Sequence, residues 1–81
     1  MTTTAAIAAA LTEALEAAAA EADANCGLVS VNFSLLAPPA PGQARASVER
    51  KTRTLIFMNA AYVGADGVLI ASAASVHRIG D

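Results

Sequence analysis

The first quarter of the chain has the apolar pattern of an amphipathic helix. Ile7, Leu11 and Leu15 recur every four residues, and most positions around them are alanine, the strongest helix former. A threonine near the start of the chain can supply the N-cap, and Gly27 is well placed to end the helix with a positive φ. We therefore predict a helix over residues 5–24.

The remainder of the chain has the patterns of strands. Two segments alternate between apolar and polar residues, and the segments after them are richer in β-forming apolar residues. The proline-rich segment 37–42 cannot continue a sheet, whereas Asp66-Gly67 favours a tight turn between strands. The predicted strands span residues 28–36, 43–51, 54–63 and 68–79.

Length and composition limit the size of the core. The chain has 81 residues, enough for a single domain over residues 1–81, and its aromatic residues are two Phe, one Tyr and no Trp. Large side chains for the core are therefore few. We expect association with another copy to supply part of the stability.

Charge and cysteine content exclude several classes of partner. The net charge is −2 and the basic residues cluster only at 50–53, so we expect no nucleic-acid partner. Acidic residues interrupt the apolar N-terminal segment, so we expect neither an export signal nor a membrane partner. Because Cys26 is the single cysteine, no intramolecular disulfide can form, and we expect a cytoplasmic protein.

Three segments, in their order and spacing, resemble the hotdog-fold thioesterases, and most closely the PaaI-like acyl-CoA thioesterases. The first reads VSVNFSLLAP over residues 29–38 and is followed by Gly42. The second reads RKTRTL over residues 50–55, and the third reads DGVLIASA over residues 66–73. The resemblance covers roughly residues 5–79.

The resemblance implies an α+β fold of the hotdog type. One N-terminal helix would pack on a four-stranded antiparallel sheet, with the first strand after the helix beside the last. The usual first strand of the family and the loop after it have no counterpart here, so we expect an N-terminally truncated hotdog domain. It also implies a homodimer or a dimer of dimers, in which Ser30, Asn32 and Ser34 lie on the strand that pairs across the two-fold axis.

The resemblance also implies a catalytic carboxylate. Leu11-Thr12-Glu13-Ala14 is similar to the family's helix segment with an acidic residue two positions after a Leu, so Glu13 is the expected catalytic residue. It would act as a general base on water, or as a nucleophile, at a thioester carbonyl held by the backbone N–H groups of Ala5 and Ala6. The family usually has His-Gly-Gly at this helix start, where this chain has Thr4-Ala5-Ala6.

Candidate substrate contacts lie in the second half of the chain. Arg50, Lys51 and Arg53 are suited to the phosphates of coenzyme A, although a solvated hairpin tip explains them equally well. Asn59, the one polar residue of its apolar segment, can contact a substrate or satisfy a neighbouring backbone group. Cys26 and the lone His77 fit packing or surface roles better than reactive ones, and we expect no metal site and no cofactor.

Three functions remain open at this point. The first is an acyl-CoA thioesterase, and the second is a non-catalytic hotdog remnant that binds acyl-CoA or only oligomerises. In the third, the Ala-rich helix is an interaction element for another protein.

Overall fold

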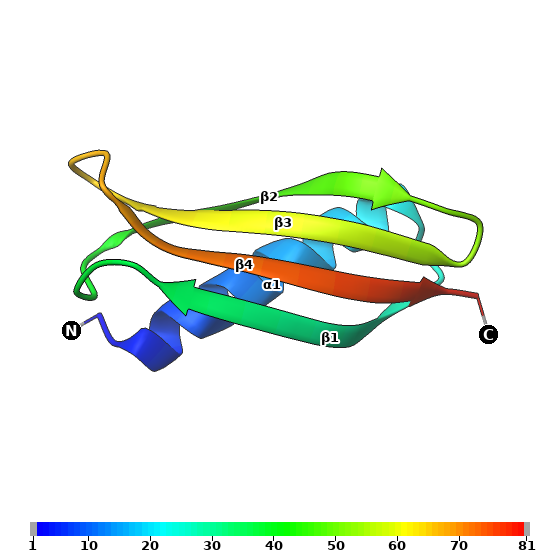
Figure 1. The fold of residues 1–81 in the computed structure, drawn as a ribbon, viewed down its shortest axis with the longest axis horizontal. Coiled ribbons are helices and arrows are strands. Elements are labelled where there is room, and N and C mark those ends of the chain that lie inside the picture. The colour runs from blue at the N-terminus through cyan, green and yellow to red at the C-terminus, as the bar shows by residue number, and fades with distance from the viewer. Residues whose placement is uncertain (1, 81) are drawn as a thin grey trace.

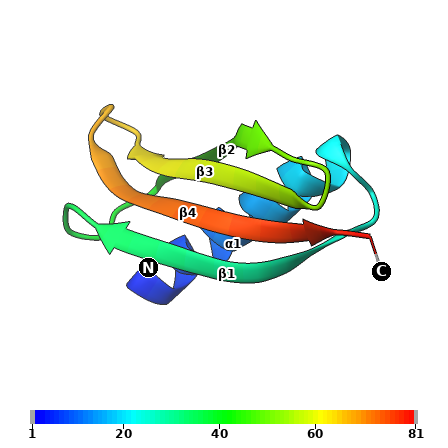
Figure 2. The same ribbon diagram turned by 45° about the vertical axis from the view of Figure 1, so that its right-hand side comes forward.

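One helix lies across one face of a four-stranded antiparallel sheet in the computed structural model, which describes residues 2–80 (Figure 1). The domain is elongated, with principal dimensions of 38 × 19 × 18 Å. Over the described part of the chain, no helix covers the opposite face of the sheet (Figures 1 and 2). The elements are α1 (Thr4–Ala22), β1 (Cys26–Leu35), β2 (Gly42–Lys51), β3 (Leu55–Gly64) and β4 (Leu69–Ile79).

The strands are ordered β1-β4-β3-β2, and every neighbouring pair is antiparallel. The prediction that the first strand after the helix lies beside the last is confirmed, as is the fold class of one helix on a four-stranded sheet. β3 and β4 are the two central strands, whereas β1 and β2 form the two edges. The order follows from two tight antiparallel connections, which place β2, β3 and β4 in a meander.

Helix α1 begins at a threonine cap and buries one apolar stripe. The side chain of Thr3 accepts a hydrogen bond from the Ala6 N–H, and the stripe contains Ile7, Leu11, Leu15 and Ala19. The helix ends two residues before the expected position. Asp23 takes an extended conformation as the C-cap, and its carboxylate accepts the N–H of Asn25.

The expectation of a positive φ at Gly27 is wrong. The positive-φ glycines of the described chain are Gly67 and Gly80, whereas Gly27 already belongs to β1 and pairs with Arg78. An aspartate cap at Asp23 ends the helix, so no left-handed residue is needed there. Gly67 supplies the left-handed conformation in the predicted Asp-Gly turn, where the Asp66 side chain also accepts the Val68 N–H.

The core lies between α1 and the inner face of the two central strands. Alternate residues of β3 and β4 point toward the helix, as expected for the two-residue period of a strand. The buried apolar residues of the sheet are Ile56, Met58, Ala60, Tyr62, Ile70, Ala71 and Ala73. α1 crosses the sheet diagonally and makes its most extensive contact with β2 and then β3, whereas its contact with β1 and β4 is smaller (Figures 1 and 2).

The apolar side of β1 is therefore more exposed than the alternating pattern predicted. Phe33 and Leu35 pair with inner-face residues of β4, yet they keep 38% and 54% of their surface exposed. Val29 falls in a register shift between Leu28 and Ser30 and is 61% exposed. A period of two identifies the apolar side of a strand, but it does not show whether a helix reaches that side.

Candidate functional site

Glu13 lies on the exposed side of α1. The buried stripe of the helix includes Leu11 and Leu15, and Glu13 is two residues from each, which is about 200° around the helix axis. The carboxylate consequently points away from the sheet into solvent. Within one copy of the chain, Glu13 has the accessibility that a base acting on water requires, but the helix alone does not form a cleft around it.

The start of α1 supplies backbone N–H groups, one of which already has a partner. Ala5 and Ala6 are exposed, as an oxyanion site requires. The Ala6 N–H donates to Oγ1 of Thr3 at 3.0 Å, and the Ile7 N–H donates to the Thr3 carbonyl oxygen at 3.0 Å. A thioester oxygen that approached Ala6 would have to displace the Thr3 hydroxyl.

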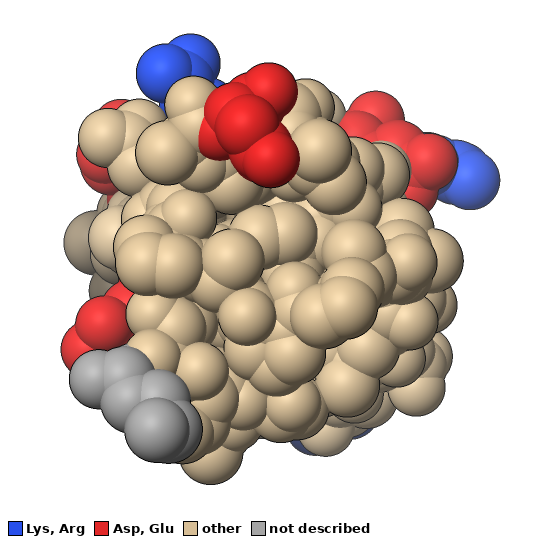
Figure 3. Space-filling model, turned by 90° about the vertical axis from the view of Figure 1, so that its left-hand side faces the viewer, with Lys and Arg blue, Asp and Glu red and all other residues tan. Residues whose placement is uncertain are grey.

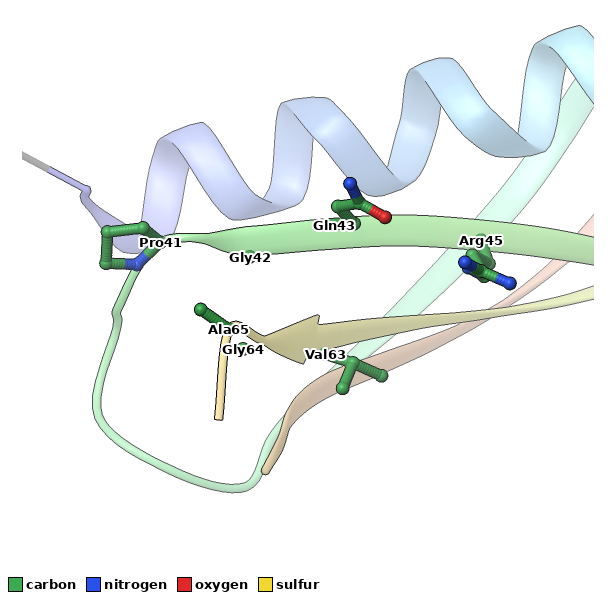
Figure 4. Close-up of a pocket in the computed structure, with 7 residues that line it drawn as sticks. All are labelled: Pro41, Gly42, Gln43, Arg45, Val63, Gly64 and Ala65. Carbon is green, nitrogen blue, oxygen red and sulfur yellow. The ribbon is translucent and has the colours of Figure 1, made fainter. Parts of the chain in front are cut away.

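The predicted phosphate-binding residues lie at the other end of the molecule. Arg50 and Lys51 close β2, and Arg53 lies in the turn that follows, with all three exposed. β2 starts at the same end of the domain as α1 and runs to the opposite end of the 38 Å domain (Figures 1 and 4). Within a single copy, the structure therefore separates these cations from the helix start at Ala5.

Asn59 lies on the sheet face opposite α1. Its neighbours along β3, Met58 and Ala60, are buried beneath the helix, so Asn59 points to the uncovered side. There it forms a cross-strand row with Ala74 of β4 and Ser47 of β2. Asn59 is exposed and shares a shallow hollow of about 310 Å³ with Arg45 and Ser47. Asn59 and Glu13 consequently do not meet within one copy.

Arg45 is a candidate that sequence reasoning did not identify. It lines both the Asn59 hollow and a larger one of about 700 Å³ at the start of β2. Figure 4 shows the larger hollow, whose polar side chains are Gln43 and Arg45 and whose lining contains no acidic residue. The available signal was the alternation of Gln43 and Arg45 with small residues, which places both on one strand face.

The end of the molecule around this hollow has little charge. Figure 3 views the end that holds the start of α1 and the β3–β4 turn, and it shows a broad uncharged surface with few acidic or basic groups at its rim. Large apolar residues are exposed where β1 and β4 meet the loops. They are Leu35, Leu36, Val68 and Leu69.

The two remaining candidate side chains have packed positions. Cys26 is partly buried at the start of β1, and His77 of β4 is buried against the helix layer. Burial lowers the pKa of His77 below its ordinary 6.5, and the negative charge of Glu16 acts in the opposite direction. Within residues 2–80, no three His, Cys, Asp or Glu residues form a group able to hold a metal ion.

Comparison with known proteins gives matches to solved structures. No family model matches the sequence, and no curated protein matches it. A structure of a thioesterase-superfamily protein has a TM-score of 0.83 with 17% identity, covering 96% of this chain and 61% of that one. Over the described residues, no helix is long and apolar enough to cross a membrane.

Two further structures extend the match. A phenylacetic acid degradation-related protein of Ralstonia eutropha JMP134 has a TM-score of 0.76 and 25% identity, covering 95% of this chain and 61% of that chain. A Bacillus halodurans protein crystallised with CoA has a TM-score of 0.76 and 14% identity, covering 86% of this chain and 53% of that chain.

These matches confirm the resemblance at the level of the fold. The helix and sheet of this chain are those of the hotdog fold found in thioesterase-superfamily proteins. The chain spans between 53% and 61% of the length of the three structures described above.

Proposed function

We propose that this chain is a thioesterase-like hotdog protein that hydrolyses an acyl-CoA thioester. The observation that supports this function most directly is the match of nearly the whole chain to thioesterase-superfamily structures. The CoA in the Bacillus halodurans structure supports coenzyme A as the carrier of the acyl group. In the reducing cytoplasm, where we place the protein, Cys26 would remain a free thiol.

In this proposal Glu13 is the general base. Its exposed carboxylate takes a proton from water while the water oxygen attacks the thioester carbonyl carbon. The carbon–sulfur bond then breaks, and the departing thiolate takes up a proton to give coenzyme A and a free acid. The developing negative charge on the carbonyl oxygen is stabilised by the N–H groups of Ala5 and Ala6, once the Thr3 hydroxyl has moved aside.

A second copy of the chain would complete the cleft. Within residues 2–80, β1 has a hydrogen-bonded neighbour on one side only, and its exposed apolar residues include Val29, Phe33 and Leu35. An unpaired and uncharged edge strand of this kind is suited to pair with another strand. We therefore propose a homodimer, or a dimer of dimers, in which the two β1 strands join the sheets and a cleft forms between the copies.

The proposed substrate contacts complete this arrangement. Arg50, Lys51 and Arg53 are exposed cations that can bind the phosphates of coenzyme A. Asn59 remains a proposed polar contact, and its position opposite α1 means that it would serve an assembled protein rather than the helix of its own copy.

The primary test measures free-thiol release by the purified protein with short-chain, long-chain and aryl acyl-CoA esters. We expect Glu13→Gln to lower kcat by a factor of about 10² to 10⁴, because that is the usual contribution of a general base. Glu21→Gln is the matched control, since Glu21 is also an exposed acid of α1. Equal activity in the wild type and Glu13→Gln would exclude Glu13 as the base.

Absence of turnover in the wild type would exclude hydrolysis of the esters tested. Calorimetric titration with coenzyme A and a non-hydrolysable acyl-CoA analogue then distinguishes two cases. Binding would indicate a hotdog protein that holds acyl-CoA without cleaving it. No binding would indicate a hotdog protein that only oligomerises.

The helix start provides a second test of the mechanism. Thr3→Gly removes the hydroxyl that occupies the Ala6 N–H, and glycine is itself an acceptable N-cap. Because a hydrogen bond such as that between the Ala6 N–H and the Thr3 hydroxyl contributes about 1 kcal/mol net, we expect kcat to rise about fivefold when the thioester oxygen no longer has to displace it. An unchanged kcat in this variant, with normal helix content by circular dichroism, would exclude the Ala6 N–H from the oxyanion site.

A further inference from the structure

The core contains one polar pair that the proposed chemistry does not use. Ser75 and His77 are the buried polar residues of the described chain, with 4% and 1% of their surface exposed. They lie two residues apart on β4 and so share its inner face. The Ser75 Oγ and the His77 Nε2 are 2.9 Å apart, which is a hydrogen-bond distance.

Apolar side chains flank the imidazole within the sheet. His77 pairs with Leu28 of β1 on one side and with Ile56 of β3 on the other. The hollows lined by Arg45 do not reach either member of the pair. Because both side chains lack access to a substrate, the Ser75–His77 contact is not suited to nucleophilic catalysis.

Charged groups approach His77 from only some of the surrounding elements. From α1, the carboxylate of Glu16 acts on the imidazole through its negative charge. From β2, Lys51 pairs with Ile56 and so lies two strands away in the same row. Arg78 follows on β4 but points to the opposite face, and Cys26 is the titratable residue of β1.

Protonation would therefore place a positive charge in a largely apolar layer. In the neutral imidazole, Ser75 supplies the hydrogen-bond partner of Nε2. The imidazolium has N–H donors on both nitrogens and carries a charge, and burial of that charge costs free energy. Burial is the larger influence on the pKa of His77 and lowers it, and Glu16 offsets part of this effect.

We propose that the Ser75–His77 pair is an acid-sensitive latch, which holds the second half of α1 on the sheet at neutral pH and weakens when the imidazole takes up a proton. Both residues of the latch belong to β4, and Glu16 is the α1 residue whose charge acts on the imidazole. Mild acid would thus loosen the helix that carries Glu13, the candidate catalytic residue.

The direction of the pH dependence follows from which state binds the proton. The unfolded chain takes up a proton on His77 near pH 6.5, whereas the folded chain resists it until lower pH. The stabilising effect is complete above that pH and declines as pH falls below it. Between about pH 7.5 and about pH 5, the folding equilibrium constant should decrease by up to roughly thirtyfold, the limit for one proton bound only by the unfolded chain.

The test combines urea unfolding at these two pH values with three variants. His77→Gln, which keeps a hydrogen-bonding group beside Ser75, should abolish the decrease between the two pH values. Glu16→Gln should enlarge it, because the charge that favours the imidazolium is removed. Glu21→Gln, an exposed change on the same helix, should follow the wild type.

Two further readouts keep the test decisive if His77→Gln does not fold. His77 is the single histidine of the chain, so its imidazole NMR signals report its protonation without ambiguity. Amide exchange should show that mild acid accelerates opening of residues 15–19 of α1 before the central strands. Stability that is equal at the two pH values, or a Glu16→Gln variant identical to Glu21→Gln, would overturn the latch.

Discussion

The two edges of the sheet present opposite surfaces. β2 carries Arg45, Glu49, Arg50 and Lys51, and it has the most extensive contact with α1. β1 has no charged residue, and the uncharged sequence continues on both sides of it, from residue 24 to residue 44. The two strands have the same length and, within residues 2–80, both have one free side, yet only β2 carries charged side chains, one of the features that natural sheets use to prevent further pairing.

This difference suits the two edges of the sheet to different roles: β2 to contact with solvent and β1 to pairing with another strand. A free edge with charges stays in solution, because pairing would desolvate those charges. A free edge without charges, next to exposed Val29 and Leu35, lowers its free energy by pairing. The proposed dimer through β1 therefore follows from the contrast between the edges as well as from the likeness to other hotdog structures.

The largest expected effect comes from placing a charge on β1. Asn32 and Ser47 lie in one cross-strand row on the uncovered face, one on each edge. Asn32→Lys should weaken dimerisation about a hundredfold, because two lysines near the axis of an antiparallel β1 pair repel each other. Ser47→Lys should have no such effect. Sedimentation velocity over a concentration series measures both, and equal weakening by the two variants would contradict a β1 interface.

A smaller effect is expected from the glycines at the two edges. A Cβ on Gly42 of β2 would collide with the Val63 carbonyl oxygen, whereas a Cβ on Gly27 of β1 would meet no atom within 4 Å. Gly42→Ala should therefore lower the free energy of unfolding by about 1–3 kcal/mol. Gly27→Ala should leave it unchanged or raise it by about 0.5 kcal/mol. Urea denaturation of the two variants measures the difference, and similar values would show that β2 relaxes freely around residue 42.

The smallest expected effect is the response of the dimer to salt. Because β1 is uncharged, the dissociation constant of a dimer formed through β1 should change less than about twofold between about 50 and about 500 mM NaCl. A contact through β2, with its four charged side chains, would respond strongly over this range. A dissociation constant that depends steeply on salt, measured by sedimentation, would therefore place the interface at β2 and contradict the proposed β1 interface.

Local patterns in the sequence were sufficient for the elements and their order. The four-residue spacing of Ile7, Leu11 and Leu15 marks the buried stripe of α1, and Asp66-Gly67 marks the last turn. These signals depend on neighbours close in the chain. The position of β1 beside β4 required the family resemblance, since nothing near Cys26 in sequence specifies a partner that begins more than 40 residues later.

The features that sequence did not reveal depend on contacts between distant segments. The diagonal path of α1 determines that Phe33 stays exposed, and strand alternation carries no information on that path. The burial of His77 likewise depends on which sheet face the helix covers. For the candidate site, helix periodicity places Glu13 on the side opposite Leu11 and Leu15, whereas the separation of Glu13 from Asn59 depends on the layering of the helix and the sheet.

The irregularity at Val29 determines how much of β1 can take part in a continuous sheet. Pairing with β4 shifts between Leu28 and Ser30, and a bulge of this kind bends and twists its strand. The regular portion of β1 is then residues 30–35, which is about 20 Å of strand available to pair with a second copy. In the proposed dimer, a partner strand that slid past this portion would meet the bend, so the bulge would restrict the two copies to one alignment.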